Sequence, residues 1–208
     1  MSKNIEVLLI GECGSGKSSL GNFLLGKEDA FIVSDMPEKA THFITKQTVD
    51  NLSIIDTPGL EDPKDRDNEH YEDMIKYIKG LKNLNGILLV INCQETRISQ
   101  SIQTMIKKIC NIFDFETFKN VGIVFTKYYG RKKDKEKIKK SKTEFVSKLK
   151  SMVEDWFNKK LENSFEYFFI DSDFEEMDVE SIQTRFLILK WLNILNTLTY
   201  INCTQLKV

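Results

Sequence analysis

The sequence predicts an α/β fold, in which a mostly parallel, six-stranded sheet carries helices on both faces. Six short apolar runs alternate with longer segments of helical periodicity. The run Ile87–Ile91 is apolar throughout, which is typical of a central strand covered on both faces. With 208 residues, 41% hydrophobic and 29% charged, the chain is expected to form one globular domain over residues 1–208. Residues 179–208 are expected to be a C-terminal helical extension packed on it.

The strands and helices can be placed from the apolar pattern and from the turn residues. We expect strands at Ile5–Ile10, Phe43–Val49, Leu52–Ile55, Gly86–Ile91, Val121–Phe125 and Tyr167–Ile170. We expect helices at Lys17–Gly26, Asn68–Leu81, Ser99–Ile112, Lys132–Leu161 and Val179–Leu198. The turn at Asp50-Asn51 makes the second and third strands an antiparallel pair. Gly26 suits the left-handed position after the first helix, and Asn68 and Ser99 are candidate N-caps.

Composition excludes several classes of function. Thirty Lys and Arg oppose thirty-one Asp and Glu, a net charge of -1, so no overall field favours nucleic acid as a partner. The four cysteines are widely spaced and there are only two histidines, which argues against a zinc cluster and for reduced thiols. We find no signal peptide and no apolar run long enough to span a bilayer, so we expect a cytoplasmic protein.

The segment Gly11 to Ser18 reads GECGSGKS and fits the pattern GxxxxGK[ST] without a mismatch. It follows an apolar strand directly and opens a helix, which is the context that a phosphate-binding loop requires. Backbone N–H groups of the loop would point at the phosphates of a nucleoside triphosphate. Lys17 would bridge the β- and γ-phosphates, Ser18 would ligate Mg²⁺, and Ser19 would reach the α-phosphate. The predicted phosphate-binding residues are Gly11, Glu12, Cys13, Gly14, Ser15, Gly16, Lys17, Ser18 and Ser19.

A second anchor lies in the run Asp56-Thr57-Pro58-Gly59, which follows a predicted strand. A carboxylate at a strand end, downstream of the phosphate loop, is where such proteins hold Mg²⁺ through water, so Asp56 is a candidate metal ligand. Gly59 offers a backbone N–H that can approach the γ-phosphate without hindrance from a side chain. The acidic stretch 61–67 is then a candidate switch that becomes ordered on the triphosphate.

The phosphate loop and the run DTPGL, spaced as they are here, resemble the translation-factor-related GTPases. The chain is most similar to the immunity-associated GTPases (GIMAP, avirulence-induced-gene), which are relatives of septins and of the chloroplast import receptors. Thr45 matches their switch-one threonine, and Arg97-Ile98-Ser99 matches the start of their own sequence box. Ile112-Phe113-Asp114 and Val124-Phe125-Thr126-Lys127 continue that box into the base-recognition region. The resemblance, which runs from Ile5 to about Ile170, implies a three-layer, Ras-like P-loop GTPase domain.

The resemblance implies Mg²⁺ as cofactor and GTP or GDP as ligand. Thr45 would join Ser18 and Asp56 around the metal, and Thr126 and Lys127 would contact the base. Tyr129 stands where these GTPases carry the aspartate of [NT]KxD, and a phenol cannot accept two hydrogen bonds from guanine. Asp171 falls where the final base-contacting motif lies and is the candidate acceptor in its place. The residues by themselves leave guanine and adenine both open.

Turnover is expected to be slow, because Leu60 and not a water-orienting glutamine follows Gly59. Related GTPases pair across their nucleotide faces, which implies a homodimer in which Arg97 reaches the partner's phosphates. The predicted catalytic residues are Lys17, Thr45, Gly59 and Arg97. A solvated arginine at a helix cap is the alternative for Arg97.

The leading hypothesis is a GTP-binding protein that acts as a nucleotide-gated switch or assembly module. One alternative is a scaffold that holds nucleotide without useful turnover, and another is an ATP-using phosphotransferase. The basic segment 131–150 is expected to be the solvent face of a helix, and peripheral contact with anionic membranes is its alternative.

Overall fold

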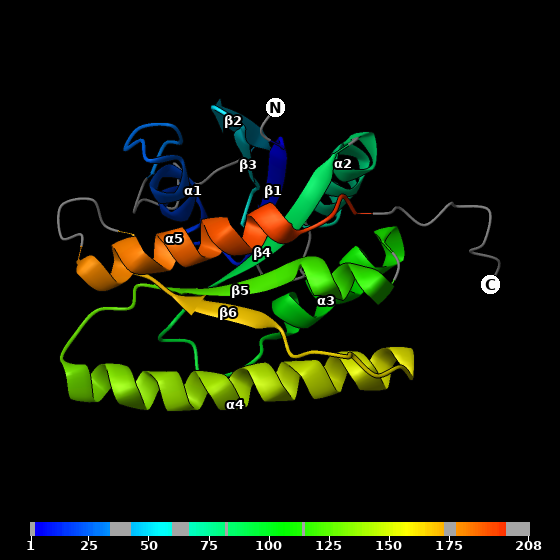
Figure 1. Ribbon diagram of the computed structural model, residues 1–208. Helices are drawn as coiled ribbons and strands as arrows, with labels where there is room; N and C mark the ends of the chain where they lie inside the picture. Colours follow the sequence, from blue (N-terminus) through cyan, green and yellow to red (C-terminus); the bar gives the residue numbers. More distant parts are fainter. Residues whose placement is uncertain are drawn as a thin grey trace.

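The sheet has six strands in the order β2-β3-β1-β4-β5-β6 (Figure 1). The computed structural model describes residues 3–33, 43–59, 67–81, 83–113, 115–172 and 178–198. Strand β2 runs antiparallel to β3, and the other four pairs are parallel. The expected α/β class and the mostly parallel sheet are therefore confirmed.

The elements follow the sequence prediction closely. The strands are β1 (Ile5–Ile10), β2 (Thr45–Val49), β3 (Leu52–Asp56), β4 (Leu84–Asn92), β5 (Val121–Thr126) and β6 (Glu166–Phe169). The helices are α1 (Lys17–Leu25), α2 (Asp67–Gly80), α3 (Gln100–Ile112), α4 (Lys132–Phe157) and α5 (Val179–Ile194). A 3₁₀ helix at Phe115–Asn120, which the sequence did not predict, leads into β5.

Several ends differ from the prediction for local reasons. β2 begins at Thr45, which pairs with the last residue of β3, so Phe43 has no place in the ladder. α4 stops at Phe157 because Asn158 adopts a left-handed conformation (φ 47°) that closes the helix. α5 ends before the predicted Leu198, whose N–H donates to the Leu84 carbonyl at 2.7 Å and draws the chain toward β4. Asn68 lies inside α2 and is not its cap.

Alternate residues of the strands enter two separate cores. Leu8 and Ile10 of β1 belong to the core that α2, α3 and α4 cover, and Val7 and Leu9 belong to the core under α1 and α5. Figure 1 shows α1 and α5 on one side of the sheet and α4 on the other. The three-layer arrangement thus follows from apolar strands that are buried on both faces.

Helix α5 forms part of the layer that also contains α1. The Arg185 guanidinium donates to the carbonyls of Phe23 (2.7 Å) and Leu24 (2.8 Å) at the end of α1. Gly122 of β5 leaves room for Trp191, since a Cβ there would come within 2.8 Å of the indole. The outer face of α5 exposes large apolar side chains, Val179, Ile182, Phe186, Leu187 and Ile194. Residues 199–208 of the predicted extension lie outside the described residues.

Parallel strands bring the predicted site residues to one edge of the sheet. β1 leads into the phosphate loop, β3 ends at Asp56, β5 ends at Thr126, and β6 leads to Asp171. Carboxyl ends of parallel strands meet at the same edge, where α/β proteins bind their ligands. No helix in the described part of the chain is long and apolar enough to cross a membrane.

Candidate nucleotide-binding site

The loop between β1 and α1 has the curled backbone that a phosphate site needs. Gly14 (φ 69°) and Gly16 (φ 89°) both adopt left-handed conformations that a side chain would strain. Gly16 is the N-cap of α1, so the helix begins at Lys17 with its N–H groups directed at the loop. The amides and the positive end of the helix dipole favour an anion here.

Lys17 lies inside this loop and is 6% exposed. Its Nζ donates to the carbonyls of Gly11 (3.2 Å) and Glu12 (2.9 Å). Burial lowers the pKa of the Lys17 ammonium, and the nearby Asp56 carboxylate opposes that shift. A partly desolvated cation held among the loop amides is well placed to bind phosphate oxygens.

Two of the predicted metal ligands touch. The Ser18 hydroxyl donates to Oδ2 of Asp56 at 2.6 Å, and Asp56 is 1% exposed at the end of β3. Hydroxyl and carboxylate oxygens are the ligands that Mg²⁺ prefers, and Mg²⁺ usually takes only one or two of them from the protein. The pair therefore fits a magnesium ion.

Thr45 is the first residue of β2, and its Cα stands opposite Asp56 in the ladder. Its side chain is exposed, and its hydroxyl makes no hydrogen bond within the described part of the chain. The structure brings the Thr45 backbone beside Asp56 without joining its hydroxyl to Ser18. Its predicted role on the metal and the γ-phosphate stays a prediction.

The run after β3 is fixed against the phosphate loop. The buried Thr57 hydroxyl donates to the Leu9 carbonyl of β1 at 2.8 Å. Gly59 lies so close to the loop that a Cβ on it would stand 2.5 Å from the Cys13 Cα. Its backbone therefore contacts the loop where the sequence predicts the γ-phosphate. Leu60 and residues 61–66 of the predicted switch lie outside the described residues.

Thr126 and Lys127 lie at the end of β5, next to the phosphate loop. The fully buried Thr126 hydroxyl donates to the carbonyls of Ser15 (2.5 Å) and Ile91 (3.2 Å), so it ties the loop to β4. Lys127 is exposed and left-handed (φ 55°), and its carbonyl accepts from the Cys93 thiol at 2.9 Å. Thr126 thus supports the loop with its side chain, and the predicted contact of the exposed Lys127 side chain with a base stays a prediction.

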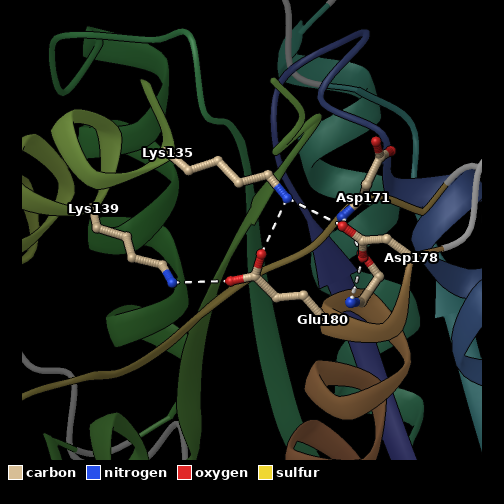
Figure 2. A network of polar contacts seen from close by, with 6 residues as sticks. Lys135, Lys139, Asp171, Asp178 and Glu180 are labelled. Atoms are coloured by element: carbon tan, nitrogen blue, oxygen red, sulfur yellow. Dashed lines mark hydrogen bonds and ion pairs between the residues drawn. The ribbon is translucent and has the colours of Figure 1, made fainter. Parts of the chain in front are cut away.

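Asp171 follows β6 on the neighbouring loop. Its N–H donates to the Ser181 hydroxyl at 3.1 Å, and its carboxylate points away from the ion pairs beside it (Figure 2). Burial raises the pKa of the Cys93 thiol, the Lys142 ammonium opposes the rise, and the Asp171 carboxylate adds to it. The Tyr128 N–H, next to Lys127, donates to the carbonyl of Ile170, next to Asp171, at 3.3 Å, so the Asp171 and Lys127 loops adjoin one another. Tyr129 is 56% exposed nearby.

The segment that carries Arg97 is joined to the phosphate loop. Ser99 caps α3 as predicted, accepting from the Ile102 N–H at 3.1 Å, and it donates to Oε1 of Glu12 at 2.5 Å. Glu12 therefore places its carboxylate at the start of α3, where the helix dipole stabilises it. Arg97 itself is exposed and makes no ion pair with any described residue.

Two of these features escaped sequence reasoning. The cap pattern revealed Ser99, but nothing near it in the sequence signals that Glu12 is its partner. The spacing of the cysteines assigns no role to Cys93, yet its thiol donates to the Lys127 carbonyl on the loop that follows β5. Both contacts join segments that are far apart in the chain, and only the fold brings them together.

Comparison with known proteins agrees with this geometry. The AIG1 family model matches residues 5–166. The GTPase Der of Borreliella afzelii (strain PKo) is 34% identical over 159 residues, which are 74% of this chain and 33% of Der. The immune-associated nucleotide-binding protein 7 of Arabidopsis thaliana is 28% identical over 131 residues, 60% of this chain and 42% of the plant protein. The chain thus spans less than half the length of either relative.

Solved structures share the fold at low identity. Toc33 from Arabidopsis thaliana in complex with GDP and Mg²⁺ has a TM-score of 0.72 at 15% identity, over 97% of this chain and 89% of Toc33. Toc33 with Mg²⁺ and GMPPNP has a TM-score of 0.70 at 18% identity, over 94% and 88%. The resemblance to the avirulence-induced-gene GTPases and the P-loop GTPase fold are confirmed. Since the family model spans β1 to the start of β6 with the phosphate loop and Asp56 inside it, this chain belongs to the AIG1 family.

Proposed function

We propose that this protein binds GTP with Mg²⁺ and hydrolyses it slowly, as a nucleotide-gated switch that pairs across its nucleotide face. The observation that carries the proposal is the 2.6 Å hydrogen bond between Ser18 and Asp56 beside the buried Lys17. A cation for the phosphates and two oxygens for the metal then lie within one loop and one strand end. In the proposed switch, Thr45 and the Gly59 backbone would contact the γ-phosphate when GTP is bound.

The relatives support guanine as the base. Der is described as a GTPase, and Toc33 has been solved with GDP and with GMPPNP. In this chain, Lys127 would lie along the base and Asp171 would accept from its N1 and N2 groups, in place of the aspartate that Tyr129 replaces. The adjoining loops of Lys127 and Asp171, which the hydrogen bond from the Tyr128 N–H to the Ile170 carbonyl joins, are consistent with such a divided base site.

Titration with fluorescently labelled GTP, GDP and ATP, with Mg²⁺ and with EDTA, tests the proposal directly. GTP should bind tightest, and chelation should weaken it, because Ser18 and Asp56 would then have no metal through which to hold the phosphates. Bound GTP should then be hydrolysed slowly, which is measured as the release of inorganic phosphate. Preference for ATP would favour the phosphotransferase alternative, and tight binding without phosphate release would favour the scaffold.

Exchange of Asp171 for asparagine should move the base preference from guanine toward xanthine. Xanthine carries a carbonyl where guanine carries the N2 amino group, so the amide N–H of an asparagine at this position could donate to it. We expect Asp171→Asn to weaken GTP binding about tenfold or more and to strengthen XTP binding relative to wild type. Competition of both nucleotides against a labelled triphosphate measures the change.

Asp134→Asn is the matched control, because Asp134 is the exposed carboxylate in the first turn of α4, just after the base-recognition loop. It should leave GTP and XTP binding as in wild type. If Asp134→Asn moved the preference and Asp171→Asn did not, the base acceptor would be Asp134.

Arg97 is proposed to reach the nucleotide of a second copy of the chain. Its side chain is exposed, and the Ser99–Glu12 hydrogen bond ties its segment to the phosphate loop. Toc33 offers a parallel, since a form with one arginine replaced by alanine is described as dimerisation-deficient. A guanidinium supplied in trans would neutralise charge on the transferring phosphate.

We therefore expect the GTPase rate per molecule to rise with protein concentration in wild type. In Arg97→Ala the rise should be lost, with a rate at least about tenfold lower at high concentration, because no arginine then reaches the partner's phosphates. Arg131→Ala, which removes the exposed arginine before α4, should behave as wild type. Rates that do not depend on concentration in any of the three proteins would exclude the finger in trans.

A further inference from the structure

Two lysines of α4 form ion pairs with the start of α5 (Figure 2). Lys135 Nζ lies 3.1 Å from Oδ2 of Asp178 and 3.1 Å from Oε2 of Glu180, and Lys139 Nζ lies 3.0 Å from Oε1 of Glu180. The Lys135 side chain is only 16% exposed. We call these four residues the α4–α5 clamp.

The clamp reaches the base-recognition loop through Tyr128. The ammonium groups of Lys135 and Lys139 lie 4.8 and 5.5 Å from the centre of the Tyr128 ring, at cation–π distance. Tyr128 is 2% exposed, and its ring centre lies 5.0 Å from that of Phe169. Its N–H donates to the Ile170 carbonyl at 3.3 Å. The residue next to Lys127 is therefore held between α4 and the end of β6.

The clamp reaches the other base loop through Ser181. Oδ1 of Asp178 accepts from the Ser181 N–H at 2.7 Å, which caps α5. The Ser181 hydroxyl in turn accepts from the Asp171 N–H at 3.1 Å, and Ser181 is 2% exposed. Asp178 thus binds a lysine with one oxygen and fixes the Asp171 backbone with the other, through a single residue.

We infer that the α4–α5 clamp positions Lys127 and Asp171 relative to one another and so sets the selectivity of this protein for guanine. The inference rests on the proposed GTP-binding function. In an [NT]KxD motif the lysine and the carboxylate lie two residues apart in one loop, so the backbone of that loop sets their relative position. Here they come from two loops, and a shift of about 1 Å between them would spoil a bidentate contact. The clamp joins both loops to the same rigid helix.

Other lysines of α4 set the clamp apart from an ordinary solvated face. Lys133, Lys137 and Lys140 are exposed and make no ion pair with any described residue. Lys137 and Lys140 together are the matched control. Their loss removes the same two charges from the same turns of α4 without touching the clamp.

The test compares wild type with Lys135→Met/Lys139→Met, with Lys137→Met/Lys140→Met and with Lys135→Arg. Binding of GTP, ATP and magnesium tripolyphosphate is measured by competition, and the melting temperature reports folding. The Lys135→Met/Lys139→Met variant should lose about five- to tenfold of the GTP-over-ATP preference, the scale of three partly exposed ion pairs. Its affinity for tripolyphosphate, which has no base, should stay as in wild type. Lys137→Met/Lys140→Met should keep the preference, and Lys135→Arg should keep most of it.

Ionic strength gives a second readout. The ion pairs are partly exposed and so are screened by salt. The GTP-over-ATP preference of wild type should therefore fall between low and high salt, and that of Lys135→Met/Lys139→Met should not.

The outcomes separate the clamp from the proposed function. A folded Lys135→Met/Lys139→Met variant with unchanged GTP-over-ATP preference would overturn the clamp's role and leave GTP binding intact. An equal loss of tripolyphosphate affinity would overturn it too, since the damage would then not concern the base. A wild-type protein with no preference for guanine would overturn the proposed function and the clamp's role with it.

Discussion

Replacing Lys17 with alanine should weaken binding of magnesium GTP by about 100- to 1,000-fold. Lys17 is 6% exposed, and its ammonium already bonds two loop carbonyls. In the complex it would instead make charge-assisted hydrogen bonds to phosphate oxygens, each worth about 1.5–3 kcal/mol in such a site. Two such bonds at the lower end of that range, about 3–4 kcal/mol together, correspond to this loss of affinity. Isothermal titration or displacement of a fluorescent nucleotide measures it.

The same substitution should leave the nucleotide-free protein nearly as stable as wild type. The variant loses the two hydrogen bonds from Lys17 to loop carbonyls, but it no longer buries the Lys17 charge. These two contributions to the free energy of unfolding offset to within about 1 kcal/mol. Lys27→Ala, at an exposed lysine just after α1, should change neither property. If Lys17→Ala lost affinity only because it unfolded, its melting temperature without nucleotide would drop sharply, and the phosphate role would then lack support.

Replacing Gly59 with alanine should impair the response to the γ-phosphate. The added Cβ would stand 2.5 Å from Cα, 2.7 Å from N and 2.9 Å from Cβ of Cys13, all closer than van der Waals contact. The phosphate loop or the run after β3 must move, at a cost of about 1–3 kcal/mol. We expect affinity for GTP to fall about tenfold or more and affinity for GDP to fall less, because Gly59 lies where the γ-phosphate is predicted.

Gly80→Ala is the control for this change. Nothing lies within 4 Å of a Cβ on Gly80, which is the last residue of α2. Alanine there should be neutral or slightly stabilising, since it favours the helix by up to about 1 kcal/mol. Equal loss of GTP and GDP affinity in Gly59→Ala would argue against a γ-phosphate role and for general damage to the loop.

Sequence reasoning found what local patterns encode. The phosphate loop, Asp56 at a strand end and the Ser99 cap each depend on neighbours within a few residues, and the structure has Ser18 in contact with Asp56 and Ser99 at the start of α3. The turn at Asp50 also fits, since its left-handed backbone (φ 51°) joins an antiparallel pair. These turn, cap and loop patterns can be recognised in the sequence alone, because the local backbone geometry itself favours those residue types.

Contacts between distant segments could not be read in the same way. The lysines of α4 have the spacing of a solvated face, and nothing marks Lys135 as the partner of Glu180 rather than of water. The early end of α4 depends on Asn158 adopting a left-handed conformation, which asparagine permits but does not require. Of the candidate base-binding region, the sequence therefore predicted only Lys127 and Asp171. The side chains of the α4–α5 clamp, which contact the loops of these two residues, could be identified only in the structure.

The bonds from Arg185 to the end of α1 have a consequence for the order in which the protein matures. The ribosome makes β1, the phosphate loop and α1 first, and Arg185 long afterwards. Until α5 emerges, the carbonyls of Phe23 and Leu24 lack this donor, and the apolar side chains of α1 lack the cover of Ile188 and Leu192. A nascent chain would carry the complete phosphate-loop sequence without a stable helix behind it. Stable capture of nucleotide is then expected only after α5 has been synthesised and has packed on α1.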